Sequence, residues 1–169
     1  RSETIRNGCD PREANMLLVT NDGRKAALDL RMIDPTMPDL PDSKINMAVE
    51  NIYRIWLENK EDKLTQLVFC DLSTPRNDGT FNVYDDIKNK LIAKGVPEEE
   101  IEYIHNAKTN PQKLKLFEDM RNGTKRILIG STSKMGAGMN VQDKLIALHH
   151  LDCPWRPSDI EQREGRILR

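Results

Sequence analysis

The sequence has few cysteines and no long apolar run, and both features narrow the class of protein. The three cysteines, Cys9, Cys70 and Cys153, form no Cys-x-x-Cys or Cys/His spacing. A zinc site is therefore not expected, and unpaired cysteines fit a reducing compartment. No apolar run approaches the ~20 residues of a membrane helix. No signal-peptide pattern opens the chain either, so we expect a cytoplasmic protein with no membrane partner.

The chain also lacks an excess of charge of either sign. Its 26 Lys and Arg residues nearly balance its 27 Asp and Glu residues, for a formal net charge of -1. Nucleic acid or an acidic membrane would therefore have to bind at a local patch. With 169 residues and 37% hydrophobic content, the chain is long enough for one soluble domain with a sizeable core. Because it begins at Arg1 without a methionine and ends in a motif, we expect a piece of a longer protein.

The first part of the sequence has the weakest pattern. Residues 15–19 (NMLLV) suit a short strand, residues 21–23 (NDG) are a turn signal, and residues 24–33 have helical composition. Three prolines within residues 34–43 predict a connector, because proline interrupts both helices and strands.

A more regular pattern follows the connector. Ser43 has the side chain of a helix N-cap, and the helix is expected to run to about Asn59. Its apolar residues recur at helical spacing and form one stripe that we expect in the core: Ile45, Ala48, Val49, Ile52, Ile55 and Trp56. We assign residues 1–62 to an N-terminal extension, connector and leading helix, and residues 63–169 to the main domain.

From Leu64 onward, short apolar runs alternate with helical patterns. The apolar runs are QLVFCDL, IEYIH, RILIG and LIALHHLD, at residues 66–72, 101–105, 126–130 and 145–152. Apolar strands that alternate with helices predict an α/β fold, with a parallel sheet covered by helices on both faces. In such sheets ligands bind at the carboxyl ends of the strands. The segments expected there are DLST, HNAKTN, STSKMGAGMN and DCPWRPS.

Capping signals mark two of the later helices. Asn110 is expected to cap a helix that has Pro111 at its first position and ends at Gly123. Ser158 and Glu161 have capping-box spacing at the start of the last helix.

The segment STSKMGAGMN, residues 131–140, has the composition of a phosphate site. Two hydroxyls and a lysine directly follow a strand, and the glycines after them permit unusual backbone conformations. Exposed N–H groups beside Ser, Thr and Lys suit a phosphate of a nucleotide or of a nucleic-acid backbone. A plain Gly-rich turn explains the segment equally well. A dinucleotide site fits less well, because GAGMNV lacks the third glycine of G-x-G-x-x-G.

The end of the chain, QREGRILR at residues 162–169, aligns three guanidinium groups. Arg163, Arg166 and Arg169 are three residues apart and therefore follow one side of a helix. Gly165 costs about 1 kcal/mol in a helix interior relative to alanine, and close approach of a ligand or another surface would explain it. A solvated charged face, paired with neighbouring acidic residues, is the alternative.

Together these two segments resemble motifs V and VI of superfamily 2 helicases and translocases. The pattern Q-R-x-G-R-x-x-R is complete over residues 162–169, and LVFCDLS resembles motif IV. GMN and the PW-x-P segment are most similar to the Swi/Snf-type branch. The N-terminal part resembles the segment before the second motor lobe in mobile-element proteins that fuse a helicase to a DNA methylase. Residues 63–169 would then be the second RecA-like lobe.

The resemblance implies roles for individual residues. In these motors ATP binds between two RecA-like lobes, and arginines of the second lobe stabilise charge on the γ-phosphate. Arg166 and Arg169 would be these arginine fingers. The residues expected to hold the nucleotide are Gln162, Arg163, Gly138 and Asn140. The residues expected to contact the backbone of DNA are Ser131, Thr132 and Lys134, with Ser73 as a further candidate.

Two motifs of a complete motor are absent from the sequence. It contains no G-x-x-x-x-G-K-[ST] and no D-E-x-[DH], which cradle phosphates and hold Mg²⁺ in the first lobe. ATP and Mg²⁺ would therefore bind mainly to a first lobe of the same parent chain, and this chain alone is expected to be inactive. The alternatives are a non-catalytic RecA-like docking module and a Rossmann-type nucleotide-binding enzyme. His105, His149 and His150 are interpreted as strand-end residues, so no metal ligand is expected.

Overall fold

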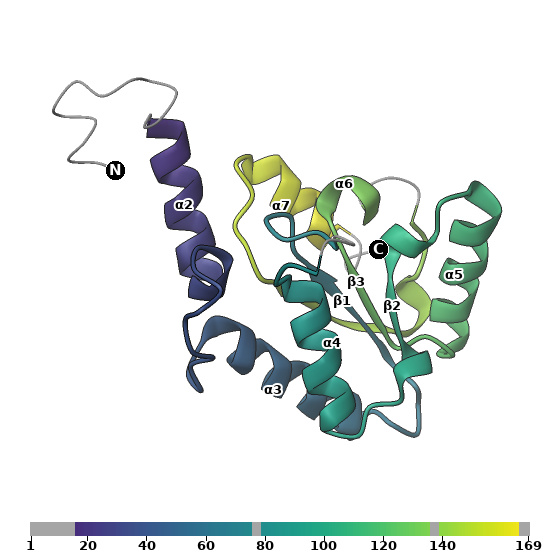
Figure 1. Cartoon of the computed structure of the whole chain (residues 1–169). Coiled ribbons are helices and arrows are strands. Elements are labelled where there is room, and N and C mark those ends of the chain that lie inside the picture. The colour runs from purple at the N-terminus through teal and green to yellow at the C-terminus, as the bar shows by residue number, and fades with distance from the viewer. Residues whose placement is uncertain (1–15, 76–78, 136–138, 166–169) are drawn as a thin grey trace, which may run out of the picture.

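A four-stranded parallel sheet forms the centre of the protein. The computed structural model describes residues 16–75, 79–135 and 139–165. The strands are β1 (Thr65–Phe69), β2 (Ile101–Tyr103), β3 (Ile127–Gly130) and β4 (Leu145–His150). They lie in the order β2-β3-β1-β4, and all neighbours are parallel (Figure 1). The predicted α/β fold is confirmed.

Strand β1 lies between β3 and β4, and all five of its residues are buried. A strand buried on both faces has few polar side chains, which explains the apolar run in the sequence. Thr65 and Gln66 are the exceptions. The Thr65 hydroxyl has no hydrogen-bond partner among the described residues, whereas the Gln66 amide is bonded at both its nitrogen and its oxygen. Its Nε2 donates to the Ile52 carbonyl at 3.0 Å, and its Oε1 lies 2.8 Å from His149 Nε2.

Helices α3 (Lys44–Glu58) and α4 (Val83–Ala93) cover one face of the sheet. The predicted stripe of α3 is confirmed as core, because Ile45, Ile52 and Trp56 are buried against the sheet. The predicted cap is confirmed as well, since Ser43 Oγ accepts a hydrogen bond from the Asn46 N–H at 3.2 Å.

Helix α5 (Asn110–Asn122) and the short helix α6 (Thr132–Met135) cover the opposite face. The expected cap of α5 was wrong by one residue. Thr109 is the N-cap and forms a capping box with Gln112, because the extended backbone at Thr109 lets its hydroxyl reach the helix. Gly123 ends the helix with a φ of 75°, as predicted, a conformation that favours glycine.

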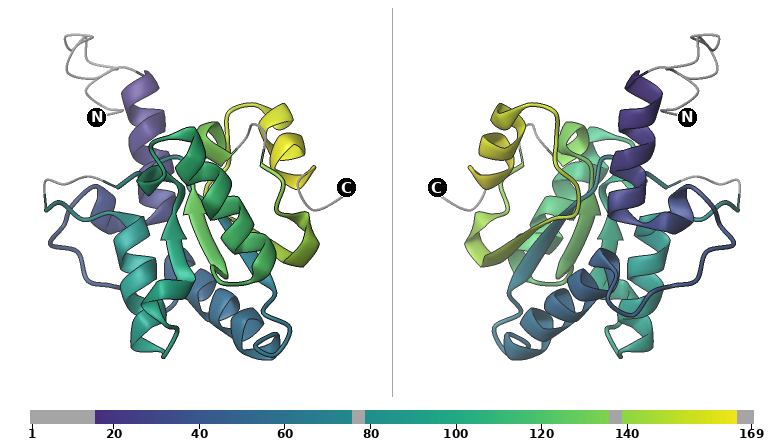
Figure 2. Two further views of the ribbon diagram at one scale, coloured as in Figure 1. Left: turned by 90° about the vertical axis from the view of Figure 1, so that its right-hand side faces the viewer. Right: turned by 90° about the vertical axis from the view of Figure 1, so that its left-hand side faces the viewer.

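Residues 16–23 do not form the expected strand and turn, because Met16–Leu28 is one helix, α2, that includes the NDG segment. A short apolar run suits either structure, and no strand of the sheet pairs with it. Leu28, near the end of α2, is buried in the core beside α3 and α4. Figures 1 and 2 show the other end of α2 pointing away from the sheet.

An ion-pair network joins the N-terminal extension to the sheet domain. Arg31 Nη2 lies 2.7 Å from Asp29 Oδ2 and 2.9 Å from Asp86 Oδ2 on α4. Asp39, in the proline-rich connector, lies 2.7 Å from Lys90 Nζ, also on α4. The connector is thus fixed on the same helix that α3 packs against. None of the described helices is long and apolar enough to span a membrane.

Candidate functional site

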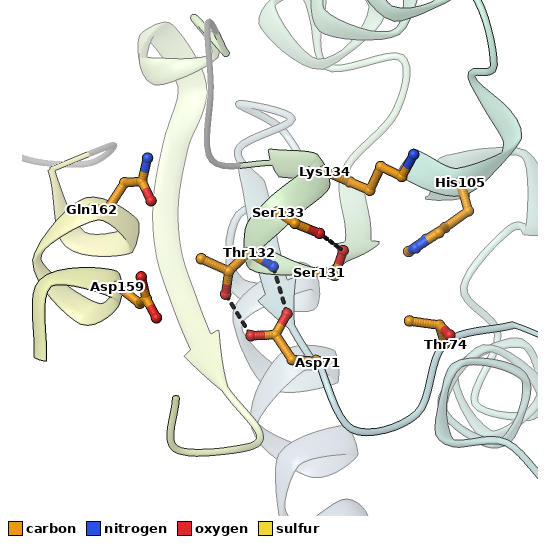
Figure 3. Close-up of a pocket in the computed structure, with 9 residues that line it drawn as sticks. All are labelled: Asp71, Thr74, His105, Ser131, Thr132, Ser133, Lys134, Asp159 and Gln162. Carbon is orange, nitrogen blue, oxygen red and sulfur yellow. Dashed lines mark hydrogen bonds between the residues drawn. The ribbon is translucent and has the colours of Figure 1, made fainter. Parts of the chain in front are cut away.

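A pocket of about 600 Å³ lies at the carboxyl ends of the strands, where the sequence predicted binding. Its lining residues follow three different strands or belong to α7 (Pro157–Glu164): Asp71 and Thr74 after β1, His105 after β2, Ser131 to Lys134 after β3, and Asp159 and Gln162 on α7. Figure 3 shows His105 and Thr74 on one side of this pocket and the two α7 residues on the other.

The segment after β3 supplies hydroxyls and the positive charge. Ser131 Oγ lies 3.1 Å from Ser133 Oγ, and Lys134 follows on the same turn (Figure 3). Gly130 makes this close packing possible, because a Cβ there would lie 2.6 Å from Ile104 Cγ2 and 2.7 Å from Met135 Cγ. A glycine at the end of β3 therefore brings α6 against the segment after β2.

Arg163 of α7 is buried at the base of this site, with 1% of its surface exposed. Its Nε donates to Thr132 Oγ1 at 2.7 Å, and its Nη2 lies 2.6 Å from Asp71 Oδ2. The Asp152 carbonyl accepts from Nη1 at 3.2 Å, and Asp152 Oδ1 lies 3.3 Å from Nη2. Nη1 also lies 3.3 Å from His150 Nδ1, and the guanidinium lies 5.1 Å from the centre of the Phe69 ring. The planar guanidinium can bind several oxygens at once, which an ammonium group cannot do in this geometry.

The two carboxylates around Arg163 are bound to the backbone as well. Asp71 Oδ1 accepts from the Thr132 N–H at 2.6 Å, and Asp71 Oδ2 accepts from the Thr132 hydroxyl at 2.7 Å. Asp152 Oδ2 accepts from the N–H groups of Asp71 and Leu72 at 2.5 and 2.8 Å. We call Asp71, Thr132, Asp152 and Arg163 the carboxylate–arginine network. It joins the segments after β1, β3 and β4 to α7.

The structure brings four of the predicted site residues to the pocket: Ser131, Thr132, Lys134 and Gln162. The Thr132 hydroxyl is already used inside the protein, since it donates to Asp71 and accepts from Arg163. Arg163 lies under the pocket and does not line it.

The other predicted site residues lie elsewhere. Ser73 is buried, and its Oγ accepts from the Val83 N–H at 2.9 Å, at the start of α4. Asn140 is exposed outside the pocket, and its carbonyl accepts from Arg121 Nη1 at 2.8 Å. Three predicted residues lie outside the described part of the chain: Gly138, Arg166 and Arg169.

The start of α7 differs from the prediction. Ser158 does not cap the helix, which begins at Pro157 with Arg156 as N-cap. The Arg156 side chain makes no capping hydrogen bond. Trp155, just before it, is 63% exposed and so belongs to the rim and not to the core.

The pocket is lined by the segments expected at the carboxyl ends of the strands, but some of its lining residues were not predicted. Asp71, Thr74 and His105 lie in DLST and HNAKTN, the segments expected at the carboxyl ends of their strands. No local sequence pattern indicated the roles of Asp71 and Asp152, because their partners are distant in the sequence. Asp71 is 92 residues from Arg163.

Two histidines near the site, His105 and His150, have lowered pKa values. Burial, with a smaller contribution from Lys134, lowers the pKa of His105, whose buried Nδ1 has no hydrogen-bond partner in the described part of the protein. Burial and the nearby Arg163 lower the pKa of His150. Among residues 16–75, 79–135 and 139–165, no group of three or more His, Cys, Asp or Glu side chains could hold a metal ion.

Comparison with known proteins identifies one family. Residues 44–169 match the family model described as the helicase conserved C-terminal domain. The match begins at the first residue of α3 and includes the whole sheet, the pocket and the carboxylate–arginine network. No curated protein matches the chain.

Proposed function

Because the chain belongs to the helicase conserved C-terminal domain family, we propose that it is the second RecA-like lobe of an ATP-dependent DNA helicase or translocase. The family match over residues 44–169 carries this proposal. The pocket supports it, because segments that resemble motifs IV, V and VI meet at one edge of the sheet. The lobe would act together with a first RecA-like lobe of the same parent chain.

The backbone of DNA would bind on the side of the pocket formed by Lys134, Ser131 and Thr74. An ammonium group and hydroxyls suit phosphate oxygens, and such contacts read no bases. Binding would therefore be independent of sequence and sensitive to salt. His105 adds a further donor on this side, because a neutral imidazole carries one N–H.

The nucleotide would bind on the α7 side, where Gln162 lies at the pocket. ATP supplies the phosphoryl group whose transfer to water drives such motors. Arg166 and Arg169, which complete the motif, would stabilise the charge that develops during transfer, and Gly138 would add a nucleotide contact. Asn140 lies outside the pocket and could reach the nucleotide only if its segment moved. The described residues would form part of an ATP site and not a complete one. Mg²⁺ would be held by the first lobe, because the Asp71 carboxylate is already bound by Thr132 and Arg163.

Arg163 would act as a positioning residue for both halves of the site. Its guanidinium holds the Thr132 segment on one side and the segments after β1 and β4 on the other. A change in α7 would therefore reach the DNA side of the pocket through the Arg163 and Thr132 side chains.

A measurement of ATP turnover tests the proposed function. We expect the chain alone to release no phosphate above background, with or without DNA. A complete motor that contains this lobe should hydrolyse ATP faster when DNA is added. Turnover by the chain alone that survives Arg166→Ala and Arg169→Ala together would contradict the proposal. Absence of DNA-stimulated turnover in the complete motor would favour the docking-module alternative.

The finer assignment rests on the motifs alone. GMN and PW-x-P support a Swi/Snf-type motor, and the N-terminal part supports an origin in a mobile-element protein with a fused DNA methylase. The sequence of the parent gene tests both, because it would contain or lack the P-loop and the methylase. A cytoplasmic location is part of the same proposal.

A further inference from the structure

Helix α2 contacts the loop that leads from β4 into α7. Arg24 Nη2 donates to the Cys153 carbonyl at 2.5 Å, and the Arg24 guanidinium lies 4.5 Å from the centre of the Trp155 ring. These contacts join residues that are 129 positions apart in the sequence. Figure 1 shows α2 beside this loop, on the side of the sheet away from α5.

Arg24 lies on the part of α2 that is joined to the sheet domain. Arg24 and Leu28 are four residues apart and so lie on the same side of the helix. Leu28 is buried in the core, and the Arg31 network fixes the segment that follows it. The guanidinium is therefore carried on a helix whose end is held by the sheet domain.

Most of the loop that Arg24 contacts is exposed, at Cys153, Trp155 and Arg156. Trp155 is 63% exposed, and the Arg156 side chain makes no capping hydrogen bond to α7. Pro154 and Pro157 flank this segment and restrict its backbone. A displacement of Trp155 would thus be passed on to the first turn of α7. That helix carries Gln162 at the pocket and Arg163 in the carboxylate–arginine network.

We propose that Arg24 is a positioning residue for α7. Its contacts with Trp155 and the Cys153 carbonyl fix the position of this helix relative to the pocket. The N-terminal extension then contributes to the function of the lobe and does not only precede it in the sequence. This inference rests on the proposed function for its effect on ATP turnover, but the contact itself is a property of this chain. The contact of Arg24 with the Trp155 ring and its hydrogen bond to the Cys153 carbonyl both depend on geometry. They can act together only while the loop keeps its position beside α2.

Hydrogen exchange of the α7 amides in this chain tests the contact. We expect Arg24→Ala and Trp155→Ala each to speed exchange in α7 by roughly three- to tenfold, with no change in α4. Trp155→Phe keeps a ring and should recover part of the protection. Arg54→Ala is the matched control, because Arg54 is an exposed helical arginine paired with Glu58. Unchanged α7 exchange in both alanine variants would overturn the proposal.

Turnover in a complete motor tests the consequence. We expect Arg24→Ala to lower kcat for ATP several-fold and to leave the affinity for DNA nearly unchanged, whereas Arg24→Lys recovers part of kcat. Faster α7 exchange with unchanged kcat would mean that the contact is only structural, and would overturn the proposal. A wild-type motor without turnover would contradict the proposed function instead, and α7 exchange would then decide the positioning role alone.

Discussion

Arg163 and Asp71 are joined across the site, with Arg163 Nη2 lying 2.6 Å from Asp71 Oδ2 although 92 residues separate them in the sequence. The Arg163 side chain is fully buried, whereas that of Asp71 is 30% exposed. The pair therefore links the end of β1 to α7 beneath the surface of the pocket. Arg163 thus joins segments that line the pocket but does not line the pocket itself.

We expect Arg163→Ala to lower the free energy of unfolding by about 3–5 kcal/mol. The loss leaves the buried Asp152 carboxylate without its cation, and unpaired buried charges are costly. Arg163→Lys should cost less, because the charge remains but the branched donor geometry is lost. Urea unfolding of the chain measures both, and Arg54→Ala on α3 is the control with an expected loss below about 1 kcal/mol. Equal losses for Arg163→Ala and Arg54→Ala would contradict the network.

The hydroxyl of Thr132 is expected to contribute to stability more than to DNA binding. Thr132→Val keeps the shape but leaves Arg163 Nε and Asp71 Oδ2 without this partner, for a cost of about 1–3 kcal/mol. Thr132→Ser keeps the hydroxyl and should cost less. Urea unfolding and DNA affinity are measured on the same preparations. A Thr132→Val variant of normal stability that binds DNA poorly would identify Thr132 as a direct contact.

Lys134 is predicted to contact a phosphate. In a complete motor, Lys134→Ala should weaken DNA binding similarly for every DNA sequence and reduce the slope of log K against log salt by about 1. Lys60→Ala is the control, because Lys60 is exposed and precedes β1, so it lies near the amino end of that strand and not at the carboxyl ends where the pocket lies. An affinity and a salt slope equal to those of the wild type would show that DNA binds elsewhere.

Arg166 and Arg169 are predicted to act in turnover and not in binding. In a complete motor, Arg166→Lys and Arg169→Lys should each reduce kcat strongly with little change in ATP or DNA affinity. The reason is that a finger acts on charge that develops during transfer. Arginine fingers in related chemistry are worth roughly 10³–10⁵ in rate, so a small share of that effect is measurable. Gln162→Ala should instead raise KM for ATP. Near-normal kcat in both lysine variants would remove the main support for the finger assignment.

His149 makes stability depend on pH. Burial, with a smaller contribution from His150, lowers the pKa of His149 from 6.5 to about 4. Between these values the unfolded chain binds a proton that the folded chain does not, so stability is complete above pH 6.5 and falls as the pH drops toward 4. The loss from this residue is up to about 3 kcal/mol.

His149→Gln is the matched variant for this effect, because a glutamine amide can still donate to Gln66 Oε1 but does not titrate. Unfolding in urea at several pH values should show a shallower dependence in the variant between pH 6.5 and 4. His105 and His150, whose pKa values burial also lowers, add the same slope to both proteins. Parallel curves for the two proteins would contradict the assignment.

Local patterns were enough to predict the elements of the sheet domain. Strands β1 and β3 are apolar because parallel strands inside a sheet are buried on both faces, and these runs are visible in the sequence. Gly123 and Ser43 were predicted correctly for the same reason, since each acts on backbone groups within a few residues. Where two local solutions compete, as at Thr109 and over Met16–Leu28, the pattern was not sufficient.

The amino-acid sequence by itself determined the alternation of strands and helices, the family match over residues 44–169, and the segments that meet at the carboxyl ends of the strands. Only the tertiary structure decided the strand order, the burial of Arg163 between Asp71 and Asp152, and the turning of the Ser73 hydroxyl toward α4. These features join residues that are far apart in the chain or depend on which neighbour satisfies a buried polar group. Local composition carries no record of such partners, because any of several donors or acceptors would satisfy the same group.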